Sequence, residues 1–140
     1  MTINSTYKHS ELTDLVIKTF YEVYNELGYG FAEVVYRNSL QIALIEKGLE
    51  AKAEVHIPVL FHGANVGDFK PDLIVNNCLI LELKAADTIV RAHEAQLLNY
   101  LRASSIEVGL ILNFGPKPEL RRLVYENSRK QVKVFRASQT

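Results

Sequence analysis

Residues 69–84 read FKPDLIVNNCLILELK. Residues 78–84 are apolar except for Glu82 and Lys84, and a run of this density is typical of a central strand. The pair Asn76-Asn77 tolerates left-handed backbone conformations, so it predicts a tight turn before that strand. The stretch therefore predicts two neighbouring strands that carry charged side chains among apolar ones.

The charged side chains of the second strand lie on one face. Successive side chains of a strand point to opposite faces, so Glu82 and Lys84 share one face while Leu81 and Leu83 share the other. Burying such charges without partners costs several kcal/mol. We expect this charged face to line a cleft.

The position of Asp72 depends on the length of the turn. A two-residue turn would pair Val75 with Cys78 and direct Asp72 to the wrong face. We predict instead either an odd-length loop that pairs Val75 with Leu79, or a bulge near Pro71. Either arrangement brings the aspartate opposite the glutamate of the next strand.

The remaining elements follow from apolar periodicity and turn residues. Apolar positions at spacings of three and four predict helices at Ser10–Leu27 and 32–47, with Gly28 and Gly48 as stop signals. The other expected elements are strands at 55–61 and 67–75 around a turn at 62–65, a helix from 88 or 91 to 101, a buried strand at 106–114, a short helix within 118–128 and an edge strand at 131–136.

The expected order is α-α-β-β-β-α-β-(α)-β, an α/β fold in which helices flank a mixed sheet. With 140 residues, of which 48% are hydrophobic, the chain can bury one sizeable core. We therefore expect a single domain over residues 1–140.

Charge and cysteine content restrict the class of protein. Basic and acidic residues number 16 each, so any contact with nucleic acid must rely on local patches. The segment 117–136 holds seven basic and two acidic residues, an excess of five. It suits contact with a phosphate backbone, and equally well a solvated sheet edge at which Lys and Arg prevent pairing with another strand.

The single Cys78 excludes an internal disulfide and a cysteine-rich zinc site, which favours the cytoplasm. Neither a signal peptide nor an apolar stretch of roughly 18 residues is apparent, so we expect no membrane partner.

Two carboxylates and a lysine in one cleft suit phosphodiester hydrolysis. If Asp72 and Glu82 converge, their oxygens form a hard site for Mg²⁺ or Mn²⁺. Lys84 would lie beside the scissile phosphate, where a cation can orient or acidify the attacking water and offset developing charge. The alternative is a metal-free ion pair between Glu82 and Lys84.

The spacing Pro71-Asp72, nine residues, then Glu82-Leu83-Lys84 resembles the PD-(D/E)XK nuclease signature. The segments GFAEVVY at 30–36 and HEAQLLNY at 93–100 resemble the GxxExxY family, a bacterial and archaeal group within that superfamily. The resemblance extends over roughly residues 10–125. It implies a restriction-endonuclease-like core and a Mg²⁺- or Mn²⁺-dependent nuclease that acts on nucleic acid, DNA more than RNA.

The resemblance also implies roles for individual residues. Asp72 and Glu82 would be metal ligands, with support from Glu33 as a third, and Lys84 would be catalytic. Gln96 and Tyr100 match the glutamine and tyrosine that follow the motif lysine in exonuclease-like branches, where they contact substrate or order the site.

Helical geometry agrees with that match. His93, Gln96 and Tyr100 stand at i, i+3 and i+7, so one side of a helix presents all three. His93 itself suits phosphate or metal binding, but a histidine near a helix start more often has a structural or solvated role.

Other readings stay open for the helix at 32–47. Glu33 could pair with Arg37 at i+4 instead of approaching a metal. Tyr36 is better explained by packing between this helix and the sheet than by catalysis.

Three functional hypotheses follow. The first is a Mg²⁺-dependent DNA nuclease. The second is a non-catalytic nucleic-acid-binding or adaptor module on the same scaffold, suggested by the lack of an appended recognition domain, which predicts salt-sensitive binding without turnover. The third is a homo-oligomer in which a second copy completes the site, because a compact core offers little surface for a duplex.

Overall fold

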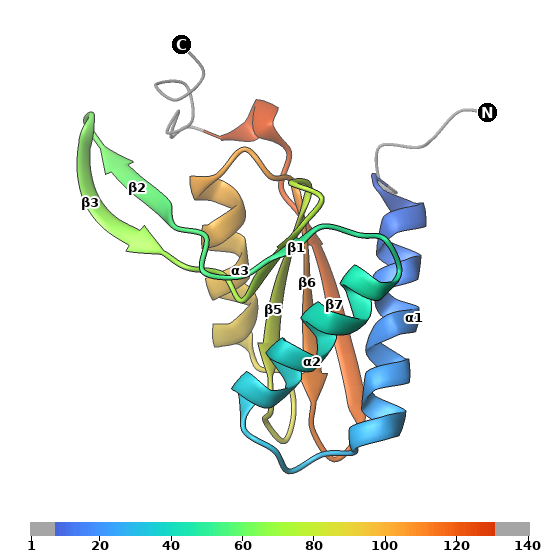
Figure 1. Cartoon of the computed structure of the whole chain (residues 1–140). Helices are drawn as coiled ribbons and strands as arrows, with labels where there is room; N and C mark the ends of the chain where they lie inside the picture. The colour runs from blue at the N-terminus through green and yellow to red at the C-terminus, as the bar shows by residue number, and fades with distance from the viewer. Residues whose placement is uncertain (1–7, 131–140) are drawn as a thin grey trace.

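The computed structural model describes residues 8–130, and its elements form three layers (Figure 1). The central sheet has the strand order β1-β4-β5-β6-β7, in which β5 and β6 are parallel and the other neighbours antiparallel. Its strands are β1 Ala51–Lys52, β4 Leu73–Val75, β5 Leu79–Lys84, β6 Val108–Phe114 and β7 Pro118–Val124. The expected mixed sheet flanked by helices is confirmed.

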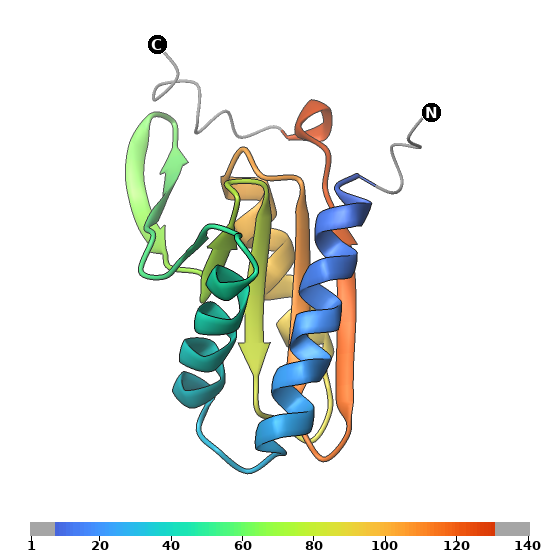
Figure 2. The ribbon, with the colours of Figure 1, turned by 45° about the vertical axis from the view of Figure 1, so that its right-hand side comes forward.

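Three helices cover this sheet. They are α1 Ser10–Leu27, α2 Glu33–Glu46 and α3 Arg91–Ala103. α1 and α2 lie together on one face and α3 on the other, as the two views show (Figures 1 and 2). All three expected helices are confirmed, because each has an apolar side that one face of the sheet can bury. Within residues 8–130 no helix is long and apolar enough to cross a membrane.

Alternation along β5 divides the core in two. Leu79, Leu81 and Leu83 pack with the helix pair α1 and α2, while Ile80 packs with α3. Side chains of a strand alternate between faces, so Glu82 and Lys84 lie on the α3 face, opposite the leucines. This confirms the predicted segregation of charged and apolar side chains on the strand.

The turn between β4 and β5 is an odd-length loop. Val75 pairs with Leu79, which leaves Asn76, Asn77 and Cys78 in the loop, and the two asparagines have φ of 51° and 55°. Asparagine tolerates this left-handed region better than most residues. Of the two alternatives predicted, the odd-length loop is therefore the one that forms.

The extended run 67–75 is divided between two sheets. β3 Ala64–Phe69 pairs with β2 Ile57–Phe61 in a separate hairpin, which projects beside the central sheet (Figure 2). Its turn is shorter than predicted: His62 and Gly63 alone form it, both with positive φ. β1 was not predicted, since a two-residue strand leaves no periodic signal.

The expected short helix within 118–128 is wrong. Residues Pro118–Val124 form β7 and pair antiparallel with β6 along its length, followed by a single turn of 3₁₀ helix at Asn127–Arg129. Leu120 and Val124 stand four residues apart, a spacing that places them on one side of either a helix or a strand. The predicted edge strand at 131–136 lies outside the described residues.

Candidate active site

The two acidic side chains of the motif are interlocked at the start of β4. The Asp72 backbone N–H donates a hydrogen bond to Glu82 Oε1 over 3.0 Å. In return, the Leu83 N–H donates to Asp72 Oδ2 over 2.8 Å. Glu82 thus accepts from the backbone of Asp72 itself, and Asp72 accepts from the residue that follows Glu82, so the two are held together where the regular ladder between β4 and β5 ends.

Both carboxylates are harder to ionise than usual. The side chain of Glu82 is buried, and burial together with the negative charge of Asp72 raises the pKa of Glu82 to about 8. Burial also raises the pKa of Asp72, against the Leu83 N–H and the charges of Lys84 and Arg37, which lower it. Two negative charges in a low-dielectric site repel each other strongly. The nearby cations do not offset this repulsion, so a further positive charge between the two carboxylates would be stabilising.

This raised pKa predicts a pH-dependent stability. A carboxyl group that holds its proton more tightly in the folded state stabilises that state below its unfolded pKa, near 4.5, and the contribution is lost as pH rises through about 8. In a chelator, the Tm of the parent relative to Glu82→Gln should therefore fall by several degrees between pH 5 and pH 8. Thermal unfolding followed by circular dichroism measures this; parallel Tm curves for the two proteins would contradict it.

Helix α3 adds polar groups above the carboxylates. Lys84 Nζ donates to Gln96 Oε1 over 3.1 Å, so the helix holds the motif lysine. Burial, with the charges of Glu82 and Asp72, raises the pKa of the buried Tyr100 to about 12. The phenol therefore keeps its proton at neutral pH and can act as a hydrogen-bond donor.

His93 has a structural contact at the start of the same helix. Its Nδ1 accepts a hydrogen bond from the Val90 N–H over 3.2 Å, which satisfies a donor that has no partner within the helix. Partial burial and the charge of Lys84 lower the pKa of His93. This arrangement corresponds to the structural alternative for the histidine.

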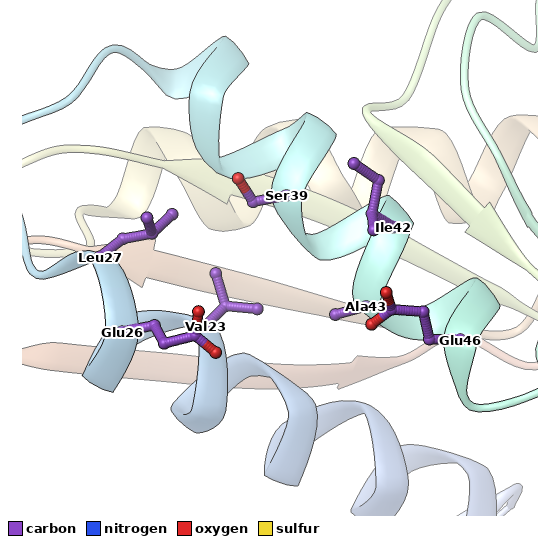
Figure 3. Close-up of a pocket in the computed structure, with 7 residues that line it drawn as sticks. All are labelled: Val23, Glu26, Leu27, Ser39, Ile42, Ala43 and Glu46. Atoms are coloured by element: carbon purple, nitrogen blue, oxygen red, sulfur yellow. The ribbon is translucent and has the colours of Figure 1, made fainter.

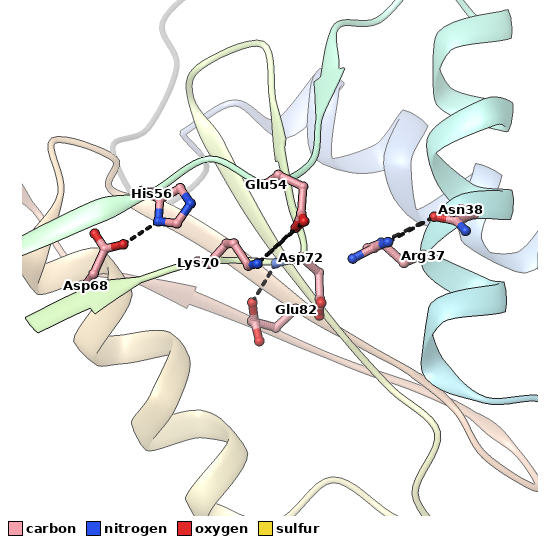
Figure 4. A network of polar contacts seen from close by, with 8 residues as sticks. All are labelled: Arg37, Asn38, Glu54, His56, Asp68, Lys70, Asp72 and Glu82. Carbon is pink, nitrogen blue, oxygen red and sulfur yellow. Dashed lines mark hydrogen bonds and ion pairs between the residues drawn. The ribbon is translucent and has the colours of Figure 1, made fainter.

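Helix α2 lies on the other side of the carboxylates. Glu33 Oε2 accepts a long hydrogen bond, 3.4 Å, from the Ala85 N–H just after β5. Arg37 donates to Asn38 Oδ1, and its guanidinium reaches from the helix towards Asp72 (Figure 4). Its charge lowers the pKa of that aspartate. Arg37 is thus a cation of the site that we did not predict, although its position four residues after Glu33 places both on one helix side.

A sequence model described as the PD-(D/E)XK nuclease superfamily matches residues 10–123. The chain belongs to this superfamily. A solved structure described as "Crystal structure of SSO0001" resembles it with a TM-score of 0.56 at 18% identity, covering 75% of this chain and 55% of that chain. The chain thus spans about half the length of that structure, and the likeness concerns the fold. Comparison with curated protein sequences gave no match.

The superfamily generally uses divalent metals, and the donor set here fits one in part. Among residues 8–130, no three histidine, cysteine, aspartate or glutamate side chains gather closely enough to hold an ion alone. Asp72 and Glu82 nevertheless offer hard oxygens, and their raised pKa values show that positive charge between them would be stabilising. Mg²⁺ suits such a pair because it keeps several waters and binds substrate phosphates.

The loop that joins β5 to α3 is held by two polar side chains, the buried Asn113 and the half-buried Glu119. The Asn113 side chain accepts from the Ala86 N–H over 2.9 Å and donates to the Ala86 carbonyl over 3.0 Å. Glu119 accepts from the Ile89 N–H over 3.1 Å. A Cβ on Gly115 would come within 2.2 Å of the Ala86 carbonyl oxygen. Close backbone approach at this glycine therefore positions the loop between the motif lysine and the helix.

We expect Gly115→Ala to lower the free energy of unfolding by about 1–3 kcal/mol, because the new methyl group would displace the Ala86 carbonyl. Gly67→Ala is the matched control, since nothing lies within 4 Å of its Cβ position, and it should change stability by less than about 0.5 kcal/mol. Urea unfolding of both variants measures the difference. Equal stability of the two would show that the loop adapts freely.

A second hollow lies away from this site. It has a volume of about 260 Å³ and lies between α1 and α2 (Figure 3). The charged residues among those described in its lining are Glu26 and Glu46. Their negative charge would repel a polyanion, so this hollow does not suit a nucleic acid.

The basic segment at 117–136 is partly committed to structure. Arg121 pairs with Glu94 of α3, and Arg122 donates to the Lys8 carbonyl. Lys130 is buried and donates to the carbonyls of Ser104 and Ile106. Within the described part of the segment, these three cations support the fold, which favours the structural explanation of the local charge excess.

Proposed function

We propose that the chain is a metal-dependent nuclease that hydrolyses phosphodiester bonds, with DNA as the expected substrate. The observation that carries the proposal is the interlocked pair Asp72 and Glu82 with Lys84 on the same strand face, in a member of the PD-(D/E)XK superfamily. We further propose that it forms a single domain of the GxxExxY family, on the segments 30–36 and 93–100, and that it works in the cytoplasm.

In this proposal, Asp72 and Glu82 would hold Mg²⁺ or Mn²⁺, with Glu33 as a third carboxylate at the rim. The metal, when bound, would act as a Lewis acid and lower the pKa of a coordinated water. Both Asp72 and Glu33 are close enough to Glu82 for their charges to raise its pKa. The charges of Asp72 and Glu33 therefore act at Glu82, where a bound cation would offset them.

Lys84 would place its ammonium group beside the scissile phosphate. Gln96 holds that amine through a single hydrogen bond, which leaves two of its three donors available for phosphate oxygens or water. A cation held in this way stabilises the charge that develops in the transition state. Tyr100, which keeps its phenolic proton, would donate to the same group of oxygens.

Two observations favour the alternative of a non-catalytic nucleic-acid-binding or adaptor module. Without a cation, Glu82 is mostly protonated at neutral pH, and no ready three-ligand cluster stands among residues 8–130. Such a module would bind nucleic acid in a salt-sensitive way and turn over none of it. The homo-oligomer, in which a second copy completes the site, is a further proposal that light scattering tests directly.

The deciding experiment measures binding and cleavage of four substrates by the purified chain in Mg²⁺, Mn²⁺ or chelator. The substrates are linear duplex DNA, circular DNA, single-stranded DNA and RNA. Metal-dependent cleavage of any of them supports the nuclease. Salt-sensitive binding without cleavage supports the adaptor module. A preparation that neither binds nor cleaves any of the four contradicts both functions.

A further inference from the structure

The loop between α1 and α2 holds two aromatic side chains in solvent. Tyr29 is 62% exposed and Phe31 is 48% exposed. Tyr29 lies between Gly28 and Gly30, whose φ values are 69° and 114°, and Phe31 follows the second glycine. The hydroxyl of the fully buried Tyr36 donates to the Gly28 carbonyl over 2.7 Å and accepts from the Phe31 N–H over 3.3 Å. A buried anchor therefore holds the backbone at both ends of this short loop. The Phe31 ring also packs edge-on against the Tyr36 ring, and the rest of its surface is exposed.

These rings border a hollow beside the active site. The hollow measures about 130 Å³ and is lined by residues 29–31, 85–87 and 114–116. Ala85 directly follows Lys84 in the chain and donates to Glu33. The hollow thus lies at the end of β5, one residue beyond the motif lysine.

The lining indicates which part of a substrate fits. Among the residues that line this hollow in the described part of the chain, Asp87 is charged. Its carboxylate would repel a phosphate. The cations Lys84 and Arg37, which act on Asp72, suit phosphate instead. A hollow with aromatic walls, backbone polar groups and one carboxylate suits a flat, uncharged ring system that carries hydrogen-bond donors.

A nucleobase has these properties. Aromatic side chains stack on bases with little regard to sequence, because every base has a π face. A base inside a duplex is already stacked on its neighbours, so it must be unpaired to reach such a platform. Exposed tyrosine and phenylalanine beside a phosphate-binding site therefore favour single strands over intact duplexes.

We propose that Tyr29, Phe31 and Asp87 form a subsite for an unpaired base adjacent to the scissile phosphate, so that the chain acts on single strands or on unpaired ends. This inference rests on the proposed nuclease function. The metal and the lysine cannot distinguish a single strand from a duplex. The inference assigns that preference to the loop at 28–32.

The test measures affinity in chelator by fluorescence anisotropy for a short single strand, the same strand with abasic positions, and a blunt duplex. Tyr29→Ala and Phe31→Ala should each bind the single strand about ten-fold more weakly than the parent, because each variant loses the stacking of one base on one ring. Phe61→Ala is the control, because that ring is 61% exposed on the projecting hairpin and should leave affinity within about two-fold. Tyr29→Phe, which keeps a stacking ring, should restore binding.

A thermodynamic cycle makes the result specific. If Tyr29 stacks on a base, Tyr29→Ala and the abasic strand each weaken binding, and the two changes together weaken it no further. Additive losses, or a Tyr29→Ala variant that matches Phe61→Ala, overturn the subsite, while metal-dependent cleavage by the parent would still support the nuclease. A parent that binds and cleaves no nucleic acid overturns both.

Discussion

Replacing Lys84 by alanine should lower the rate of DNA cleavage by a factor of about 10²–10³, the usual loss when one group that stabilises transition-state charge is removed. Lys84 is half-buried on β5, with its amine bonded to Gln96. Since a cation in this position acts mainly on charge that develops during the reaction, kcat should fall while KM changes little. Single-turnover cleavage of labelled DNA in Mg²⁺ measures the effect on the chemical step.

Two further variants make this result interpretable. Lys18→Ala removes an exposed lysine from α1, on the opposite face of the sheet, and should cleave at the parental rate. Gln96→Ala leaves the lysine in place without its partner, so a smaller loss is expected. Undiminished cleavage by Lys84→Ala would show that a contaminating nuclease produced the activity.

Replacing Asp72 by asparagine should weaken Mg²⁺ or Mn²⁺ binding by at least about ten-fold, because it removes one of the two paired negative charges. Asparagine keeps an oxygen that can accept the Leu83 N–H, so the local backbone should be retained. The loss of charge also lowers the pKa of Glu82, since Asp72 contributes to its elevation. Calorimetric titration measures both effects when it is repeated in buffers of different ionisation enthalpy.

The sign of the proton exchange is a sharper criterion than affinity alone. With its pKa near 8, Glu82 must release a proton when a cation binds at neutral pH, so parental affinity should rise from pH 6 to pH 8. The Asp72→Asn variant should release fewer protons. Asp14→Asn, an exposed site on α1, should behave as the parent, and parental affinity in Asp72→Asn would mean that the metal binds elsewhere.

Much of the helical structure could be predicted from the sequence. α1 begins and ends at the predicted residues, Ser10 and Leu27, because its amphipathic pattern and the glycine that follows it are both local. The charged and apolar faces of β5 were also predictable, since alternation is a property of a single strand. Signals of this kind depend only on residues within a turn or two of one another.

For the geometry of the acidic pair, the sequence left two alternatives open. An odd-length loop and a bulge near Pro71 both placed Asp72 opposite Glu82, and the observed pairing of Val75 with Leu79 selected the loop. The reciprocal hydrogen bonds between these residues and the backbone carry no sequence signal. They form because β4 begins only at Leu73, opposite Leu81, while β5 continues to Lys84, and this depends on how both strands pack.

Residues from separate elements required the folded chain. Arg37 approaches Asp72 from α2, and Asn113 clamps the loop after Lys84 from β6. Neither contact follows from spacing, because Arg37 and Asp72 are 35 residues apart along the chain and Asn113 and Ala86 are 27 apart. The same holds for the aromatic loop at 28–32, which lies beside residues 85–87 only in the tertiary structure.

By itself, the sequence determined the three long helices, the apolar strand with its two charges and a spacing of acidic and basic residues that resembles the superfamily signature. The tertiary structure decided that residues 118–124 form a strand rather than a helix, because β6 offers a complete row of backbone partners along its outer edge. It also decided which carboxylates meet and how strongly they resist ionisation. Both depend on burial and on charges brought together from distant parts of the chain, which local sequence patterns do not encode.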